Sequence, residues 1–216
     1  MIGGLQKVTL LDFPGKVACT VFLTGCNLRC PYCHNPELVL PRNNGKTVSE
    51  NELFEFLFSR KGKLDGVCIT GGEPTELPFL IRRIRDMGFL IKLDSNGTLP
   101  EMLEHLLREE LLDYVAMDIK NAPSRYAETC GADVIEQVKK SAALLKNGNI
   151  DYEFRTTVCH PFHSPKCMEE IGRWLRNAKR YYIQPFVDSG NLLGSGISAM
   201  EKPELEALLS AVKPYI

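Results

Sequence analysis

The sequence predicts an α/β fold class: a partial (β/α)6 barrel of parallel strands with outer helices. Six short runs rich in β-branched and aromatic residues recur along the 216 residues, and helical patterns separate them. This alternation is typical of parallel sheets. Most of the runs are almost continuously apolar, as in strands that are covered on both faces. Six units are too few to close a barrel that needs eight strands, so we expect the barrel to stay open.

The predicted elements follow in chain order. The strands cover residues 17–23, 66–70, 89–94, 114–118, 152–158 and 181–186. Ser49, with Glu52 three residues later, forms a capping box that opens a helix reaching about residue 58. Gly88 ends a helix that begins near Pro78, and Pro100 stands in the first turn of the next one. Further helices are predicted over 133–147, 168–178 and 203–212.

Composition and charge exclude several classes of protein. A net charge of −1, with 44% hydrophobic and 25% charged residues, argues against a nucleic-acid partner and against a disordered chain. The apolar runs are far shorter than the ~18 residues that a membrane span needs, and the N-terminus lacks the pattern of a secretion signal. We therefore expect a cytoplasmic protein, with a single domain over residues 1–216 and no nucleic-acid or membrane partner. In that compartment, cysteines are expected to be metal ligands, redox groups or buried side chains rather than disulfides.

Three of the eight cysteines, Cys26, Cys30 and Cys33, lie within eight residues. On a helix they would form one stripe and could simply be buried. A glycine before the first cysteine and prolines within and after the segment favour a loop around a metal centre instead. Zinc would need a fourth ligand, for which His34 is the local candidate. A 4Fe–4S cluster with three cysteine ligands is the better match, because it leaves one iron with an open coordination position.

Polar residues follow the predicted strands at their carboxyl ends, where parallel α/β folds bind ligands. In chain order they are Gly71, Gly72, Glu73, Pro74, Asp94, Ser95, Asn96, Asp118 and Lys120, and Arg155 lies within the predicted strand 152–158. Glu73 offers an acceptor for an ammonium group, and Arg155 offers a clamp for a carboxylate. Each group also has a simpler interpretation. These are a tight turn at 71–74, an Asx turn at 94–97, a salt bridge at the rim for Asp118 and Lys120, and a surface cation for Arg155.

The cysteine loop Cys26-Asn-Leu-Arg-Cys30-Pro-Tyr32-Cys33 resembles the signature of the radical S-adenosylmethionine (SAM) enzymes. The resemblance implies a 4Fe–4S cluster held by the three cysteines, whose open iron binds SAM, and it implies that Tyr32 lies near the adenine. In this family the reduced cluster splits SAM to give a 5′-deoxyadenosyl radical.

The strand ends are similar to those of the glycyl-radical-enzyme activases. The implied SAM contacts are Tyr32, Gly71, Gly72, Glu73, Pro74, Asp94, Ser95, Asn96, Asp118, Lys120 and Arg155. Lys120 and Arg155 also take catalytic positions in this resemblance. A monovalent cation near Asp94 and Asp118 is a further implication. Val187 stands where the related enzymes have a histidine after the last strand.

The opening segment Thr9-Leu-Leu-Asp12-Phe-Pro14-Gly15 looks most like the longer type of anaerobic ribonucleoside-triphosphate reductase activating protein. This resemblance implies hydrogen abstraction from a glycine of a partner glycyl radical enzyme. It also implies a one-electron donor such as flavodoxin or ferredoxin. Two alternatives stay open at this point: a radical SAM enzyme that acts on a small molecule or peptide, and a zinc-stabilised binding module.

A second group of metal-ligating residues, Cys159, His160, His163 and Cys167, could also be drawn as a zinc site. Two prolines make the geometry of this loop uncertain, and cysteine and histidine pairs are common without metal. Core packing is expected for the three remaining cysteines.

Overall fold

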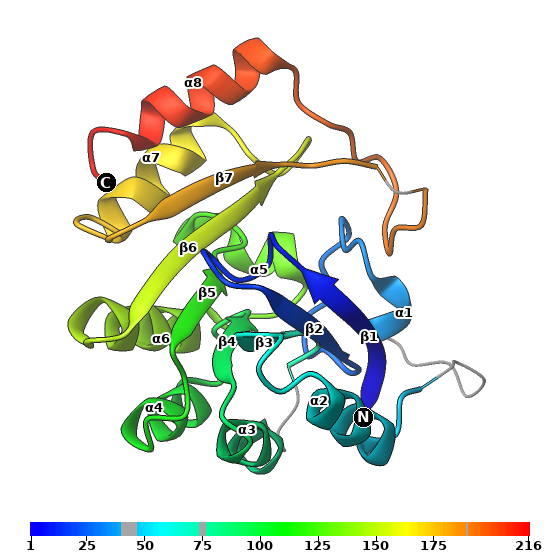
Figure 1. Cartoon of the computed structure of the whole chain (residues 1–216). Helices are drawn as coiled ribbons and strands as arrows, with labels where there is room; N and C mark the ends of the chain where they lie inside the picture. The colour runs from blue at the N-terminus through cyan, green and yellow to red at the C-terminus, as the bar shows by residue number, and fades with distance from the viewer. Residues whose placement is uncertain (40–46, 74–76, 189) are drawn as a thin grey trace. The chain divides into compact units, whose positions relative to one another are not determined.

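The computed structural model describes residues 1–39, 47–73, 77–188 and 190–216. In these residues seven strands form one sheet in the order of the chain (Figure 1). The strands are β1 (Ile2–Thr9), β2 (Ala18–Leu23), β3 (Gly66–Gly71), β4 (Leu90–Ser95), β5 (Tyr114–Asp118), β6 (Asp151–Val158) and β7 (Tyr181–Pro185). The α/β fold class is confirmed, and the ends of β2 to β7 agree with the predicted strands to within one residue.

Helices connect most of these strands. They are α1 (Pro36–Val39), α2 (Glu50–Ser59), α3 (Leu77–Asp86), α4 (Pro100–Arg108), the 3-10 turn η1 (Pro123–Arg125), α5 (Tyr126–Cys130), α6 (Ile135–Asn147), α7 (Pro165–Trp174) and α8 (Lys202–Val212). None of the helices in the described part of the chain has the length and apolarity that crossing a membrane requires.

The N-terminal strand β1 corrects the prediction of six strands. It pairs with β2 in the antiparallel direction, with Leu5 opposite Val21 and Thr9 opposite Ala18. Its residues alternate poorly, since two glycines and an exposed Gln6-Lys7 pair interrupt the apolar pattern. An antiparallel strand at the edge of a sheet does not need the continuous apolar run that identifies a buried parallel strand. The apolar pattern of the sequence therefore does not identify β1.

The capping residues explain both a confirmed helix and a displaced one. At α2, the Ser49 hydroxyl accepts a hydrogen bond from the Glu52 amide at 3.2 Å, and the Ser49 amide donates to the Glu52 carboxylate at 2.8 Å. The predicted capping box is thus confirmed.

Helix α7 begins before the predicted residue 168, because the Ser164 side chain caps it by accepting from the Cys167 amide. Pro165 stands in its first turn, where its missing N–H costs nothing.

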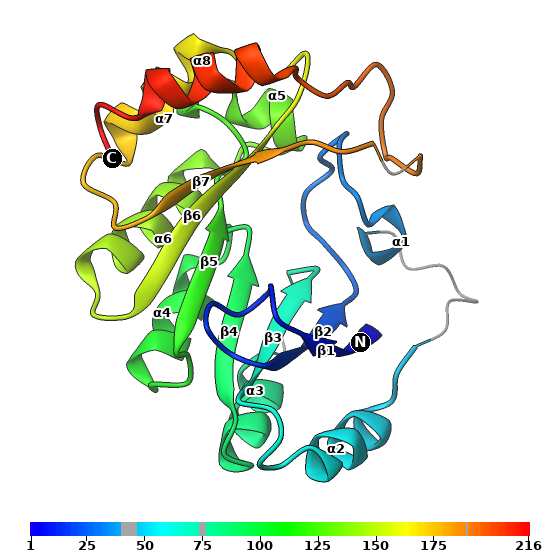
Figure 2. The ribbon, with the colours of Figure 1, turned by 45° about the horizontal axis from the view of Figure 1, so that its top comes forward.

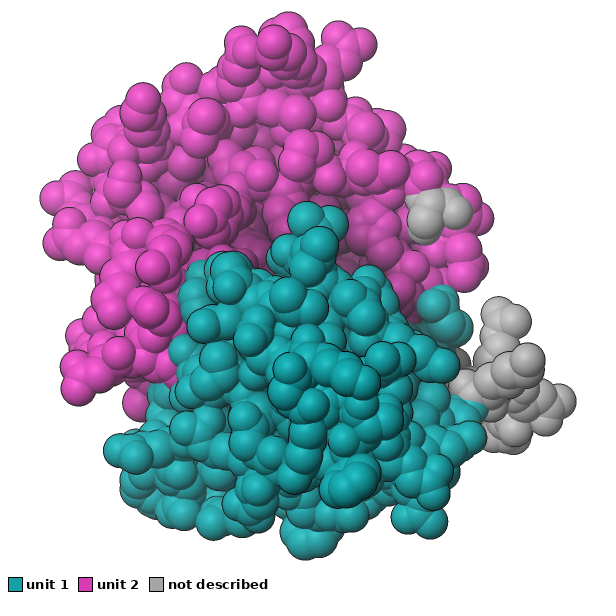
Figure 3. Space-filling model, viewed as in Figure 1, with its two compact units in different colours: residues 1–27, 37–95, 101–115 teal, residues 28–36, 96–100, 116–216 magenta. Residues whose placement is uncertain are grey.

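The chain divides into two compact units, which Figure 3 colours separately. Unit 1 comprises residues 1–27, 37–95 and 101–115, and unit 2 comprises residues 28–36, 96–100 and 116–216. The single domain predicted from the sequence stays a prediction.

In unit 1 the parallel strands β2, β3 and β4 lie side by side, with helices α2, α3 and α4 on one side of them (Figures 1 and 2). Buried apolar residues line these helices: Leu53, Leu57, Ile81, Ile84, Leu103 and Leu106. Phe13, from the segment between β1 and β2, is buried against Tyr114 and Ala18. The segment around residues 9–15 is therefore anchored to the core of unit 1 by Phe13.

In unit 2, β6 and β7 are parallel, and helices α7 and α8 lie side by side (Figure 1). Gly172 allows close packing on α7, because a Cβ atom there would lie 2.7 Å from the ring of Tyr215. Tyr152 and Phe154 of β6 are buried with their ring centroids 5.1 Å apart. These contacts belong to the core of unit 2.

Candidate active site

The glycine-rich turn after β3 is shaped by the chain that leads into the cysteine loop. Gly71 has a φ of +102°, and a Cβ atom there would lie 2.5 Å from the Leu23 carbonyl oxygen. A Cβ atom on Gly72 would lie only 1.7 Å from the Gly25 carbonyl oxygen. The Gly72 amide donates to the Leu23 carbonyl at 2.7 Å, and the Glu73 amide donates to that of Gly25 at 2.8 Å. Only glycine fits both positions. Pro74, the fourth predicted residue, lies outside the described residues.

Glu73 and Ser95 meet where β3 and β4 end in unit 1. The Ser95 hydroxyl donates a hydrogen bond of 2.7 Å to Glu73 Oε1. The side chain of Glu73 is thus held in place by the neighbouring strand end, and a carboxylate held in this way is a suitable acceptor for an ammonium group. The structure brings these two predicted residues together.

Asp94 pairs with Lys92, a residue that sequence reasoning missed. Lys92 Nζ makes an ion pair with Asp94 Oδ1, and the Lys92 side chain is only 2% exposed. A signal was present in the sequence, because a lysine stands in the middle of a run predicted to be covered on both faces. The sequence predicts a contact between Asp94 and a ligand; the structure shows that an internal cation, Lys92, already contacts this carboxylate.

The turn after β4 confirms the simpler interpretation for Asn96. Its side-chain oxygen accepts hydrogen bonds from the amide and the hydroxyl of Thr98, at 3.0 and 2.6 Å. Gly97 has a φ of +74° and lies against Met117. This is an Asx turn. A contact between Asn96 and SAM stays a prediction.

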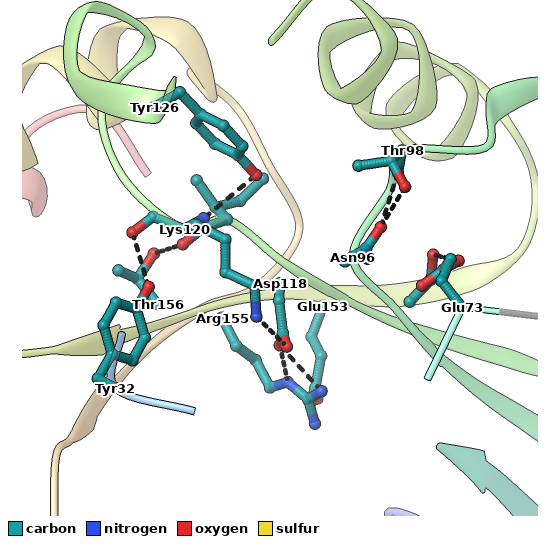
Figure 4. A network of polar contacts seen from close by, with 12 residues as sticks. Tyr32, Glu73, Asn96, Thr98, Asp118, Lys120, Tyr126, Glu153, Arg155 and Thr156 are labelled. Carbon is teal, nitrogen blue, oxygen red and sulfur yellow. Dashed lines mark hydrogen bonds and ion pairs between the residues drawn. The ribbon is translucent and has the colours of Figure 1, made fainter. Parts of the chain in front are cut away.

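A network of charges joins the end of β5 to the middle of β6 in unit 2 (Figure 4). Asp118 Oδ2 accepts from Lys120 Nζ at 2.9 Å, and Asp118 Oδ1 lies 3.0 Å from Arg155 Nη2. A more distant ion pair, at 3.9 Å, links Arg155 to Glu153. The Arg155 side chain is 16% exposed. The interpretation of Arg155 as a surface cation is therefore wrong, and the salt bridge between Asp118 and Lys120 is confirmed.

This network keeps its members charged. Burial by itself raises the pKa of Asp118, but the charges of Lys120 and Arg155 outweigh it and lower that pKa to about 2. Burial by itself lowers the pKa of Lys120, but the Asp118 carboxylate outweighs it and holds that pKa well above its usual value. Asp118 is therefore an anion, and Lys120 a cation, throughout the physiological range of pH.

Aromatic side chains hold the backbone of Lys120. The Tyr32 hydroxyl donates to the Lys120 carbonyl at 3.3 Å, and the Lys120 amide donates to the Tyr126 hydroxyl at 3.3 Å. His163 Nε2 lies 2.9 Å from the same carbonyl oxygen and donates to it. Tyr32 is buried beside Phe162 and His163. Its position near an adenine stays a prediction, whereas its support of Lys120 is visible.

The cysteine loop is anchored in unit 2 through its second half. The Arg29 amide donates to the Cys130 carbonyl at 2.8 Å, the Gly194 amide donates to the Pro31 carbonyl at 2.9 Å, and the His34 ring stacks on Phe186. These contacts extend over a loop rather than a continuous helix, as predicted. Phe186 is buried, whereas Val187, which the resemblance matches to a histidine of the related enzymes, is 69% exposed.

The donor set of the loop fits an iron–sulfur cluster chemically. All eight cysteines lie in the described residues, and none of them forms a disulfide. Cys30 is buried, while Cys26 and Cys33 are partly exposed. Over the described ranges, no three His, Cys, Asp or Glu side chains are grouped so that they could hold a metal ion. Three thiols in one short loop are the ligands of a cluster with one open iron. Their assignment as cluster ligands stays a prediction.

The carboxylates expected to bind a monovalent cation fit that group poorly. In unit 1, Asp94 is paired with Lys92. In unit 2, Asp118 is paired with Lys120 and Arg155. Each carboxylate thus already has a cationic side chain within its reach.

The second group of cysteines and histidines has other roles. His163 Nδ1 accepts from the Cys159 amide at 3.2 Å, while its other nitrogen contacts Lys120. His160, which is half-buried, lies 3.0 Å from Glu204 Oε1. The Cys167 thiol lies 3.2 Å from the Ser164 hydroxyl. In the described part of the chain, these residues do not form the zinc site that the spacing allowed.

Comparison with known proteins places this geometry in a family. A protein of Methanocaldococcus jannaschii that carries the provisional name glycyl-radical enzyme activating enzyme is 34% identical over 197 residues, covering 86% of this chain and 80% of that protein. The pyruvate formate-lyase-activating enzyme of Clostridium pasteurianum is 32% identical over 128 residues, covering 56% of this chain and 52% of that protein.

Solved structures show the same fold. The chain matches a structure described as native anSMEcpe with bound AdoMet, with a TM-score of 0.64 and 17% identity, over 89% of this chain and 57% of that one. The model of the Radical SAM superfamily matches residues 20–175, and this match favours the cluster over zinc. Because it extends from within β2 to just past α7, over well more than half of the sequence, the chain belongs to the radical SAM superfamily.

Proposed function

We propose that this protein is a radical SAM activase that takes a hydrogen atom from a glycine of a partner glycyl radical enzyme. The observation that carries the proposal is the relative from M. jannaschii, because the similarity extends over most of both chains. The pyruvate formate-lyase-activating enzyme adds a relative whose name states that it activates another enzyme.

Radical SAM enzymes use a 4Fe–4S cluster and SAM, which together supply a 5′-deoxyadenosyl radical that abstracts hydrogen. In this chain we assign Cys26, Cys30 and Cys33 to the cluster. Glu73, oriented by Ser95, would accept hydrogen bonds from the methionine ammonium group. Arg155 is positioned by Asp118 and would orient the SAM carboxylate. These residues bind and orient; the reacting hydrogen comes from the partner.

For the partner we propose anaerobic ribonucleoside-triphosphate reductase, and for the electron donor a flavodoxin or ferredoxin. The segment 9–15 supports the choice of partner through its resemblance to the longer type of that activating protein. In unit 1 this segment has a defined form: the Thr20 hydroxyl donates to Asp12 Oδ2 at 2.5 Å, and Phe13 is buried. Leu10 and Leu11 are 71% and 91% exposed in the same segment. We propose a cytoplasmic location for both proteins.

Isotope transfer tests the activity directly. The cluster-loaded protein is reduced with SAM and with a candidate reductase deuterated at glycine. We expect a glycyl doublet by electron paramagnetic resonance and deuterium in 5′-deoxyadenosine, because hydrogen abstraction requires the target carbon within about 3 to 3.5 Å of the attacking atom. The protein alone should show no such transfer. Efficient turnover of a small molecule or free peptide, without deuterium from any partner glycine, would support the alternative radical SAM reaction instead.

A further inference from the structure

We propose that Lys92 is the resident counter-ion of Asp94, and that its ammonium group takes the place of a metal cation at this carboxylate. The inference rests on the proposed function and on the SAM contact that the sequence resemblance implies for Asp94, and it concerns whether SAM binding at this carboxylate requires a metal cation. Lys92 is a positioning residue here: it acts on the cofactor through Asp94.

The burial of Lys92 is unusual. Among the described lysines and arginines it is the one with the least exposed surface, at 1% of the residue. The Asp94 side chain is 16% exposed, so it lies nearer to the surface of unit 1 than its partner does. An ammonium group buried to this extent is costly unless an anion and further polar groups compensate it. Asp94 provides that anion.

Lys92 belongs to a polar row across three parallel strands. Thr20 of β2 is the register partner of Cys68 of β3, and Cys68 is the partner of Lys92 of β4. Cys68 Sγ lies 3.8 Å from Lys92 Nζ and 3.9 Å from Asp94 Oδ1. Since side chains alternate along a strand, Asp94 lies on the same face as Lys92, one step closer to the carboxyl end of β4. The lysine therefore reaches along the strand toward the end where SAM is expected.

A metal ion would have to displace this ammonium group. Lys92 is only two residues from Asp94 in the same strand, so its effective concentration at the carboxylate is very high. A dissolved monovalent cation would also have to give up its water for a site whose charge is already balanced. In unit 2, Asp118 has two cationic partners of its own, Lys120 and Arg155. We therefore infer that the protein binds SAM without a requirement for potassium or sodium.

The experiment compares salts at constant ionic strength. SAM affinity of the cluster-loaded protein is measured by anaerobic calorimetry in potassium, sodium or choline chloride. We expect the wild-type affinities to agree within about twofold, and the Lys92→Ala variant to bind at least about tenfold more weakly in choline, the scale of a lost charged hydrogen bond. Potassium or sodium should restore most of this loss, since the substitution leaves space for a cation and removes a positive charge beside the Asp94 carboxylate. A purely structural role for Lys92 would give a loss that no cation restores.

Two further variants control for packing and charge. Cys68→Ala alters the same row without changing its charge, and the SAM affinity of this variant should not depend on the cation in the buffer. Lys92→Ala combined with Asp94→Asn removes both charges, and potassium should not increase the SAM affinity of this double variant. The melting temperature without added SAM provides a second readout: potassium should raise it above the value in choline for Lys92→Ala, but not for the wild type.

Two results would overturn the inference. One is a wild-type protein that needs potassium or sodium for tight SAM binding, a result that does not depend on whether any variant folds. The other is a folded Lys92→Ala protein with no response to the cation in either measurement. If the wild type bound SAM in none of the salts, the SAM contact itself would be wrong, and the melting temperatures would still decide whether Lys92 acts as the counter-ion.

Discussion

Arg155 contacts a single carboxylate oxygen of Asp118 with two of its nitrogens. Nε donates to Oδ1 at 3.1 Å, and Nη2 lies 3.0 Å from the same atom. The other carboxylate oxygen of Asp118, Oδ2, accepts a hydrogen bond from Lys120 Nζ. One carboxylate thus orders two cations, one from the segment after β5 and one from within β6. The arrangement orients the guanidinium group before any cofactor arrives.

Replacement of Asp118 should therefore cost stability. Asp118→Asn leaves two partly buried cations without their carboxylate, and we expect the free energy of unfolding to fall by about 1 to 3 kcal/mol. Urea unfolding monitored by circular dichroism measures it. Glu136→Gln, which breaks the exposed pair with Lys139, is the matched control and should change stability by less than about 0.5 kcal/mol. If the two substitutions lowered the free energy of unfolding equally, the Asp118 network would not stabilise the fold more than an exposed ion pair does.

Substitutions in the cysteine loop should remove iron from the protein, whereas substitution of a cysteine elsewhere should not. Replacing Cys26, Cys30 or Cys33 by alanine should abolish cluster assembly, because two thiolates do not hold a cubane firmly. Iron and sulfide analysis after anaerobic reconstitution gives the result. Cys130→Ala is the control, since this buried thiol contacts the Ala132 carbonyl and should leave the cluster intact. Full iron content in Cys30→Ala would show that the loop is not the cluster site.

Glu73 should contribute to cofactor affinity without affecting the cluster. Glu73→Ala removes an acceptor for the SAM ammonium group, and SAM binding should weaken by about 1.5 to 3 kcal/mol, the scale of a charged hydrogen bond. Ser95→Ala removes only the hydroxyl that orients Glu73 and should have a smaller effect in the same direction. Calorimetry on cluster-loaded protein compares them. Unchanged SAM affinity in Glu73→Ala would remove this residue from the site.

Gly72 should not tolerate even a methyl group. In Gly72→Ala the new Cβ atom would lie 1.7 Å from the Gly25 carbonyl oxygen, so the chain entering the cysteine loop must move. We expect a loss of more than about 2 kcal/mol in the free energy of unfolding. At Gly4, the nearest atom to a Cβ would be a side-chain carbon at 3.6 Å, so Gly4→Ala is a mild control. A Gly72→Ala protein as stable as Gly4→Ala would show that the close approach is absent.

His163 predicts a dependence of stability on pH. Burial lowers its pKa below the usual 6.5, although its backbone hydrogen bonds act in the opposite direction. Between the folded and unfolded pKa values, the unfolded chain binds a proton that the folded chain does not. The contribution of His163 is therefore complete above about pH 6.5 and declines as the pH falls. Melting temperatures between about pH 5 and pH 8 should fall less steeply toward acid in His163→Gln than in the wild type. Parallel curves would exclude this role.

The sequence alone determined the parallel α/β architecture, and it predicts a metal centre at the cysteine loop. Both follow from local patterns: apolar runs of β-branched residues at 66–70 and 114–118, the capping box at Ser49, and the spacing of three cysteines. Such patterns depend on neighbours in the chain, so they are readable without the fold. The antiparallel strand β1 escaped detection because its glycines and polar residues do not form a continuous apolar run.

Only the tertiary structure decided which partners the polar residues have. Gly72 is required by Gly25, a residue far away in sequence, and Arg155 is ordered by Asp118 of a different strand. Both ring nitrogens of His163 make hydrogen bonds to backbone groups, of Cys159 and Lys120, so this side chain supports the backbone and is not a zinc ligand. The pairing of Lys92 with Asp94 lies within one strand, yet its importance follows from burial, which depends on the neighbouring strands and helices. Charges and hydrogen bonds are satisfied across space, and the order of residues in the chain does not specify those distances.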